Sequence, residues 1–239
     1  MKHLRKLLIF FFSVIDQFFH QKRIKRFIES QKIKIRTFVD VGSFEGKYTD
    51  LILKIEKNCK IIMIEPQDKY YSLIKEKYKN NNQVEVVQLG LSDKKDTLIL
   101  KINKHEITST FSEFQSTNKY LNMKAFLFES KLENMTIKNQ EIDVMPLDDL
   151  INEKNINFID LIKIDTEGHE YKVLSGSQRS LKKINFILIE FHVDKIYKNY
   201  NPEEIHQFLI DNNFILLKKF PFPFTTWEDR VYKNSDYKG

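Results

Sequence analysis

From residue 36 onward, short apolar runs alternate with segments in which apolar residues recur every three or four positions. The runs RTFVDVG, KIIMIEP, VEVVQLGLSD, FIDLIKID and INFILIEFH are apolar at nearly every position, as in strands buried on both faces of a parallel sheet. Helical spacing characterises EGKYTDLILKIEKN, QDKYYSLIKEKYKNN, EGHEYKVLSGSQRSLKK and NPEEIHQFLIDNN. The alternation predicts an α/β fold with a mostly parallel central sheet and helices on both faces.

The alternation is interrupted after residue 93. DTLILKI predicts an extra strand, and residues 103–140 are polar, rich in Asn, Ser and Thr, and are interpreted as an insertion near the substrate side. EIDVMPLDDLINEKN predicts a strand that leads into a helix, and FILLKKF and TWEDRVYK are expected to complete the sheet. Without an internal repeat or a long linker, residues 31–239 are predicted to form one domain, preceded by an extension at residues 1–30.

The extension has a basic start and an apolar run from Leu7 to Ile15. This run is too short to cross a bilayer, for which about 20 residues are needed, and no small-residue cleavage site follows it. The spacing instead predicts an amphipathic helix, which either packs on the domain or lies on a membrane surface with its basic residues at the headgroups. Its apolar face comprises Leu4, Leu8, Phe11, Ile15 and Phe18.

The composition narrows the class of protein. With 41% hydrophobic and 30% charged residues, the 239-residue chain is typical of a globular protein. The single cysteine, Cys59, excludes an intrachain disulfide and a multi-cysteine zinc site, and we expect a small buried side chain in a cytoplasmic protein, with peripheral membrane contact left open. The net charge of +6 comes from lysines scattered along the chain, so specific nucleic-acid binding is not indicated.

The loop after the first strand, FVDVGSFEGKYT, indicates the kind of ligand. Asp40 stands about where a dinucleotide-binding fingerprint has its first glycine, and a carboxylate there would repel a pyrophosphate. A ligand with a positive end and no phosphate would be attracted instead. S-adenosylmethionine (SAM), with an ammonium and a sulfonium group, is such a ligand.

The ends of the second and third strands fit the same ligand. An acid roughly 20 residues beyond the loop glycine is placed to bind ribose hydroxyls, and Glu65 has this position after the second strand. Ser92 and Asp93 follow the third strand, where the adenine edge is expected. The predicted cofactor-binding residues are therefore Asp40, Gly42, Ser43, Gly46, Glu65, Ser92 and Asp93.

The fourth and fifth strands end in charged residues. DLIKIDTEGHEYKVLSG places acids and an imidazole directly after a buried strand, and LIEFH adds a glutamate and a histidine two residues apart, on one face of the next strand. One of these groups would remove the proton from an acceptor hydroxyl. Alternatively, Asp165, Glu190 and His192 would hold Mg²⁺ or another divalent ion, the less favoured interpretation. The candidate catalytic residues are Asp165, Glu167, His169, Glu190 and His192.

Taken together, these segments resemble the FkbM family of SAM-dependent methyltransferases. The resemblance rests on DLIKIDTEGHEYKVLSG, preceded by MPLDDLI and followed by ILIEFH, and on FVDVGSFEGKYT, MIEPQ and LGLSD, roughly residues 36–220. It implies a Rossmann-like class I methyltransferase fold and methyl transfer to oxygen, commonly on sugars or natural-product hydroxyls. By position it assigns Asp40, Gly42, Glu65 and Asp93 to the cofactor site, and Asp165, Glu167 and Glu170 to the signature. The loop departs from many methyltransferases at Ser43 and Phe44, where a second glycine is often found.

The leading hypothesis is an O-methyltransferase that acts on a hydroxyl of a sugar, glycolipid or related small molecule, held near Asp165 and His192. Thr108, Ser109 and Thr110 in the insertion are the candidate edge of the acceptor site. N-methyl or carboxyl-methyl transfer, and a non-catalytic SAM-binding module at a membrane surface, remain alternatives. Methylation of nucleic-acid bases is disfavoured, because no Asn/Asp-Pro-Pro-Tyr/Phe tetrapeptide follows the fourth strand.

Overall fold

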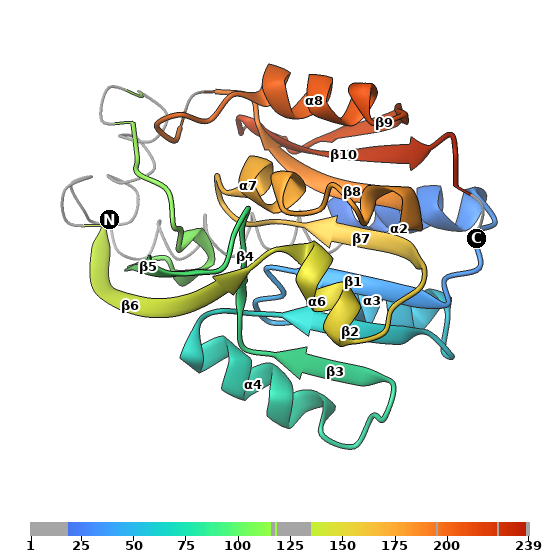
Figure 1. Cartoon of the computed structure of the whole chain (residues 1–239), viewed down its shortest axis with the longest axis horizontal. Helices are drawn as coiled ribbons and strands as arrows, with labels where there is room; N and C mark the ends of the chain where they lie inside the picture. The colour runs from blue at the N-terminus through green and yellow to red at the C-terminus, as the bar shows by residue number, and fades with distance from the viewer. Residues whose placement is uncertain (1–18, 116–117, 119–134, 195, 224, 238–239) are drawn as a thin grey trace.

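The centre of the protein is a seven-stranded sheet with the strand order β3-β2-β1-β7-β8-β10-β9 (Figure 1). The computed structural model describes residues 19–115, 118, 135–194, 196–223 and 225–237. The first five strands in this order are parallel, and β10 runs antiparallel between β8 and β9. This is the predicted α/β architecture. The strands are β1 (Thr37–Val41), β2 (Lys60–Ile64), β3 (Val84–Val87), β7 (Ile159–Ile164), β8 (Ile184–His192), β9 (Phe214–Pro221) and β10 (Trp227–Asn234).

Helices cover both faces of this sheet, as predicted (Figure 1). Alternate residues of each strand point to opposite faces, so Val39 and Ile162 join one core cluster while Phe38 and Leu161 join the other. The first cluster includes residues of α6 (Leu147–Glu153), α7 (Glu170–Ser175) and α8 (Pro202–Asp211). The second includes residues of α2 (Gln21–Ser30), α3 (Lys47–Ile55) and α4 (Asp68–Tyr78), together with the buried Cys59.

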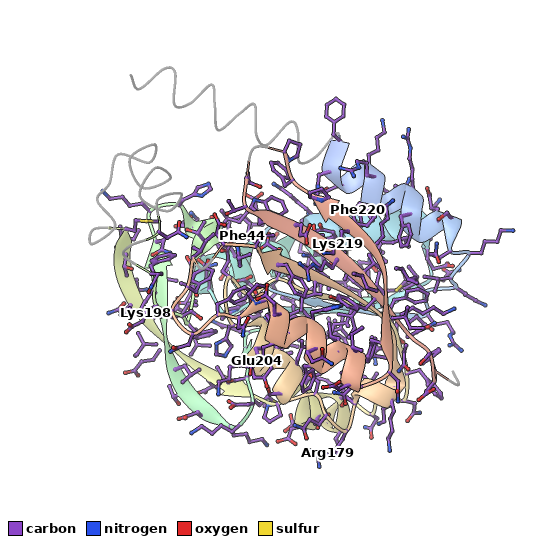
Figure 2. All side chains as sticks on the ribbon, turned by 90° about the horizontal axis from the view of Figure 1, so that it is seen from above. Phe44, Arg179, Lys198, Glu204, Lys219 and Phe220 are labelled. Carbon is purple, nitrogen blue, oxygen red and sulfur yellow. The ribbon has the colours of Figure 1, made fainter. Side chains whose placement is uncertain are left out.

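Helix α2 packs on the domain. Its Ile24 and Ile28 are buried in the second core cluster. Phe220 of β9 lies beside the helix (Figure 2), with its ring centroid 5.6 Å from that of Phe27 and 5.7 Å from the Arg23 guanidinium. The apolar face predicted for residues 4–18 lies outside the described residues. Within the described chain, no helix has the length and apolar character that a bilayer span requires.

A small second sheet, with the order β4-β6-β5, lies beside the carboxyl edge of the main sheet (Figure 1). The run VEVVQLGLSD was expected to form one strand, but the structure divides it between β3 in the main sheet and β4 (Gly90–Leu91) in the second. Gly90 lets β4 lie close to β6, because a Cβ there would lie 2.8 Å from a methyl of Val144. The other strands are β5 (Asp96–Asn103) and β6 (Thr136–Met145). Of the predicted insertion, residues 116–117 and 119–134 lie outside the described residues, and Glu106–Thr108 form a 3-10 turn.

The helix expected over residues 167–183 is shorter than predicted. Glu167 and Gly168 have φ angles of 51° and 94°, which no right-handed helix allows, so α7 begins at Glu170. It ends before Gly176, whose backbone approaches the carbonyl oxygen of Ser92 so closely that a Cβ would lie 2.0 Å from it. Residues 181–183 form a separate 3-10 turn.

Candidate active site

Polar side chains replace the apolar core at the carboxyl edge of the sheet. Asp40 of β1 pairs with Lys163 of β7, and Glu190 of β8 pairs with Asp229 of β10. Each lies two residues from an apolar residue of the core beneath α2 and α3, and so points to the same face of the sheet. In a parallel α/β sheet, ligands bind at this edge. Asp40 of the predicted cofactor site and Glu190 of the predicted catalytic group therefore lie on the same face of the sheet at this edge.

The β1–α3 loop lies directly on the end of β7. The Asp165 N–H donates to the Val41 carbonyl at 3.0 Å. Gly42 has a φ of +77°, and a Cβ on it would lie 1.8 Å from the carbonyl oxygen of Asp165. Only glycine fits this combination of backbone angle and contact. Gly46, with a φ of +75°, ends the loop as the N-cap residue of α3.

The predicted ribose acid, Glu65, is buried beneath this loop. Its carboxylate accepts the N–H of Phe44 at 2.8 Å and that of Gln67 at 2.9 Å, and burial raises its pKa to about 7. Asp40 accepts the Thr49 hydroxyl at 2.7 Å, and burial raises the pKa of Asp40 to about 6. Glu65 thus holds the loop at Phe44, while the Asp40 carboxylate bonds the first turn of α3 at Thr49.

The structure separates His169 from the other candidate catalytic residues. Its Nε2 lies 3.1 Å from the Ser92 hydroxyl, and burial lowers the pKa of His169 to about 4, so the imidazole is neutral. The neighbouring Asp93 pairs with Lys172 at 2.6 Å. His169 therefore belongs to the group at the third strand, where the adenine edge was expected, and not to the acceptor end.

The remaining candidates come together as predicted. Nε2 of His192 lies 3.4 Å from a Glu190 oxygen and 3.8 Å from a Glu167 oxygen. The Tyr197 hydroxyl donates to the Glu167 carboxylate. Burial, together with the carboxylates of Asp165 and Glu167, raises the pKa of Glu190 well above its usual value. The Asp165 side chain is 30% exposed, so it is the part of this group most open to a ligand.

Glu170, the last acid of the signature, shapes the turn that carries Glu167. Its buried carboxylate accepts the N–H groups of Thr166 at 2.9 Å and Gly168 at 3.1 Å, and burial raises its pKa to about 7. A Cβ on Gly168 would lie 2.4 Å from the Tyr197 ring. Glu170 and Gly168 therefore hold the turn in the form that presents Glu167 to His192.

A buried network that was not among the predicted site residues supports this group from below. The Lys163 ammonium donates to Asp229 at 2.7 Å and lies 3.4 Å from Asp165. Asp229 also accepts the Tyr48 hydroxyl at 2.9 Å and bonds His20 at 2.8 Å. Burial alone would lower the pKa of Lys163, but the surrounding carboxylates outweigh it and raise the pKa. Burial would likewise raise the pKa of Asp229, but Lys163 and His20 outweigh it and lower the pKa.

The hydroxyls proposed for the edge of the acceptor site bond to backbone carbonyls. Thr110 donates to the Glu167 carbonyl at 2.5 Å, Thr108 to that of His105 at 2.8 Å, and Ser109 to that of Glu106 at 2.6 Å. All three residues are buried. Thr110 thus ties the start of the insertion to the signature turn, whereas Thr108 and Ser109 bond within the insertion, and contact with an acceptor stays a prediction.

Known structures share this fold. Magnesium protoporphyrin IX methyltransferase (ChlM) from Synechocystis PCC 6803, solved with bound SAM, superposes with a TM-score of 0.51 at 8% identity over 90% of this chain and 78% of that one. TrmK of M. capricolum, solved with S-adenosylhomocysteine (SAH), gives 0.51 at 9% identity over 92% of this chain and 70% of that one. These similarities confirm the Rossmann-like class I methyltransferase fold.

Sequence comparison gives the family. A stretch of 45 residues is 36% identical to hexuronic acid methyltransferase AglP of Haloferax volcanii, and it spans 19% of either protein. The model of the methyltransferase FkbM domain matches residues 40–216, which is most of the chain and includes both the β1–α3 loop and the two charged strand ends. The chain belongs to the FkbM methyltransferase family.

Proposed function

We propose that the protein is a SAM-dependent O-methyltransferase that acts on a hydroxyl of a sugar or a related small molecule. The observation that carries the proposal is the contact between two parts of the site. The β1–α3 loop lies on the backbone of Asp165, and the Asp165 carboxylate interacts through its charge with Glu190, whose Oε2 lies 3.4 Å from Nε2 of His192. A cofactor held by this loop would thus face a group of proton acceptors.

The residues present fit SAM. Its ammonium and sulfonium groups would lie near the buried carboxylate of Asp40 and the partly exposed carboxylate of Asp165. Each Glu65 oxygen accepts one backbone N–H and keeps a lone pair for a ribose hydroxyl. Ser92 and Asp93 would border the adenine. When bound, SAM supplies a methyl group on a positively charged sulfur, the electrophile of the reaction.

The chain supplies proton transfer and orientation. The acceptor hydroxyl would exchange its proton for the methyl group, with SAH as the leaving group, and the chain's part would be to hold the hydroxyl and to receive that proton on a base. Two groups are placed to receive it, Nε2 of His192 and the carboxylate of Asp165. The Lys163 ammonium lies 3.4 Å from the Asp165 carboxylate and holds it in position from below. Holding the two reactants in one orientation would account for much of the rate.

The charges of the acceptor end favour a hydroxyl over a carboxylate as the reacting group of the acceptor. Asp165, Glu167 and Glu190 would repel an acceptor carboxylate, whereas they can accept hydrogen bonds from hydroxyls. The partial similarity to a hexuronic acid methyltransferase supports a sugar acceptor. A hexuronic acid offers both hydroxyl and carboxyl groups, and the charges here favour its hydroxyls.

The test is methyl transfer from labelled SAM to hexuronic acids, neutral hexoses and glycolipid extracts. An ether product resists mild alkali, whereas a methyl ester is hydrolysed by it. We expect alkali-stable product with the wild type and with Glu204→Gln, an exposed position on α8 (Figure 2), and a loss of about 10²-fold or more with Asp165→Asn. Binding of SAH without transfer to any acceptor would instead favour a non-catalytic module, and alkali-labile product would favour carboxyl methylation.

A further inference from the structure

We propose that Glu167, Glu190 and His192 form a binding site for a divalent cation, and that this ion holds the acceptor hydroxyls. The role in acceptor binding rests on the function proposed above, whereas ion binding itself does not. The sequence placed Asp165 in such a group. In the structure Glu167 takes that place, because the signature turn directs its carboxylate toward the strand end occupied by Glu190 and His192.

The distances suit a shared ion. Each of the three residues offers one ligand atom, and these atoms lie within 4.8 Å of one another. Nε2 of His192 is 3.4 Å from Oε2 of Glu190 and 3.8 Å from Oε2 of Glu167. Two atoms that each bind one ion at about 2.0–2.3 Å are separated by up to about 4.6 Å. The group therefore requires little movement to close around an ion.

A buried oxygen in this group lacks a donor. Oε2 of Glu190 makes no hydrogen bond in the described part of the chain, although the residue is only 7% exposed. A buried polar atom without a partner costs free energy, and such atoms are rare in native proteins. A cation bound between Glu190, Glu167 and His192 would supply the missing partner.

The excess of carboxylates around Glu190 also favours binding of a cation. The charged groups that act on Glu190 include the carboxylates of Asp165, Glu167 and Asp229 and the ammonium of Lys163. That ammonium donates to Asp229 and lies 3.4 Å from Asp165. Its charge is thus shared by two other carboxylates. A divalent ion would balance the charge of Glu167 and Glu190.

The supporting residues hold the proposed ligands in position. The Tyr197 hydroxyl donates to the Glu167 carboxylate, and the backbone N–H of His192 donates to the Tyr200 hydroxyl at 3.1 Å. The rings of Tyr197 and Tyr200 stand edge-on to the imidazole, with centroid distances of 5.0 and 5.6 Å. Such outer contacts orient metal ligands and tune affinity.

The ligand set selects among ions. An imidazole nitrogen with two carboxylates suits Mn²⁺, Fe²⁺ or Zn²⁺ better than Ca²⁺ or Mg²⁺, which prefer oxygen ligands. An ion in this place would bind two neighbouring hydroxyls of the acceptor and lower the pKa of the one that reacts. Because Nε2 of His192 would then bind the ion, the proton would pass to Asp165.

The experiment is a titration of the chelator-treated full chain with Mn²⁺. Binding is measured from the electron paramagnetic resonance signal of free Mn²⁺ and, independently, by calorimetry. The variants are Glu190→Gln and Glu167→Gln, which keep the side-chain shape, with Glu204→Gln as the matched control because it removes the same charge from an exposed position. We expect one ion per chain for the wild type and the control, and an affinity at least about tenfold lower for the other two. Circular dichroism of each variant verifies that it is folded.

Absence of Mn²⁺ and Zn²⁺ binding, or equal affinity in all four proteins, would overturn the site. SAH binding is measured on the same samples and is expected to be unchanged, because none of these residues lies at the β1–α3 loop. A chain that binds Mn²⁺ in this pattern but neither binds SAH nor transfers methyl groups would refute the proposed function and leave the ion site standing. Methyl transfer unaffected by complete removal of the ion would overturn its role in acceptor binding.

Discussion

Replacing Gly42 with alanine would remove the close contact between the cofactor loop and the end of β7. The new Cβ would lie 1.8 Å from the Asp165 carbonyl oxygen, whereas real Cβ contacts essentially never fall below 3.0 Å. The loop must therefore retreat by about 1.2 Å, the difference between those distances. That movement would break the hydrogen bond from the Asp165 N–H to the Val41 carbonyl.

The cost has two parts. A side chain at a φ of +77° is strained by about 1–3 kcal/mol. A buried backbone hydrogen bond left unmade costs about 1–3 kcal/mol. The sum of about 2–6 kcal/mol corresponds to a fall in melting temperature of roughly 5–20 °C for a chain of this size. Affinity for SAH should fall as well, because the loop no longer lies against Asp165.

Gly46→Ala is the matched control. Its φ of +75° gives the same strain, but the nearest atoms are the Tyr78 hydroxyl at 2.9 Å and the Met63 methyl at 3.0 Å, which are the ends of side chains that can move. It should therefore cost only the strain of about 1–3 kcal/mol, without the loss of a backbone hydrogen bond. Thermal unfolding followed by circular dichroism, with SAH titration of both variants, measures the difference. If Gly42→Ala melted at the same temperature as Gly46→Ala, the inferred backbone contact would be refuted.

Four further changes test other parts of the structure. Lys163→Met should lower the free energy of unfolding in urea by about 3–5 kcal/mol, because Asp229 loses its buried partner. Adding Asp229→Asn should restore part of that lost stability, whereas additive effects of the two substitutions would contradict the pairing. Because the pKa of Asp40 is raised, its contribution to stability is present below pH 3.8 and is lost as the pH rises through about 6. The free energies of unfolding of the wild type and Asp40→Asn should therefore diverge by about 3 kcal/mol across that range, and parallel pH profiles of the two proteins would exclude the raised pKa. Glu65→Ala should weaken SAH binding about tenfold or more in calorimetry, since the ribose hydroxyls lose a charged acceptor, and unchanged affinity would remove Glu65 from the cofactor site. If residues 1–18 contact a membrane, their deletion should abolish flotation with anionic vesicles, whereas equal flotation of both chains would exclude that contact.

The sequence predicted the main sheet because its signals are local. Each parallel strand is a short apolar run, and the change from apolar to charged residues at positions 165 and 190 marked the edge where the site lies. The same pattern predicted that Glu190 and His192 lie on one face, because residues two apart on a strand point the same way. It predicted that Asp165 lies beside them, because it follows the neighbouring parallel strand. The predicted burial of Cys59 is also confirmed, since this residue directly precedes the apolar strand β2.

Other features depend on contacts between distant residues and gave no local signal. Lys163 was visible as a cation in an apolar strand, but its partner Asp229 lies 66 residues away on the reversed strand. His169 is adjacent to the signature acids in the chain, yet the positive φ angles of Glu167 and Gly168 turn it toward Ser92. The short helix α7 and the separate sheet around β6 likewise follow from close backbone contacts at Gly176 and from cross-strand pairing.

The position of β10 between β8 and β9 has a consequence for synthesis of the protein. A ribosome makes β9 before β10, but β9 cannot join the sheet until β10 has paired with β8. Until then the edge of β8 is open, and the Lys163 ammonium lacks Asp229. The strands β1, β2 and β3 of the cofactor half leave the ribosome first and pair only with one another and with β7, so they can pair before β10 is made. The acceptor half would be completed only after residue 234 has left the ribosomal tunnel and β10 can pair with β8. During that interval the open edge of β8 is a place where chaperones would bind.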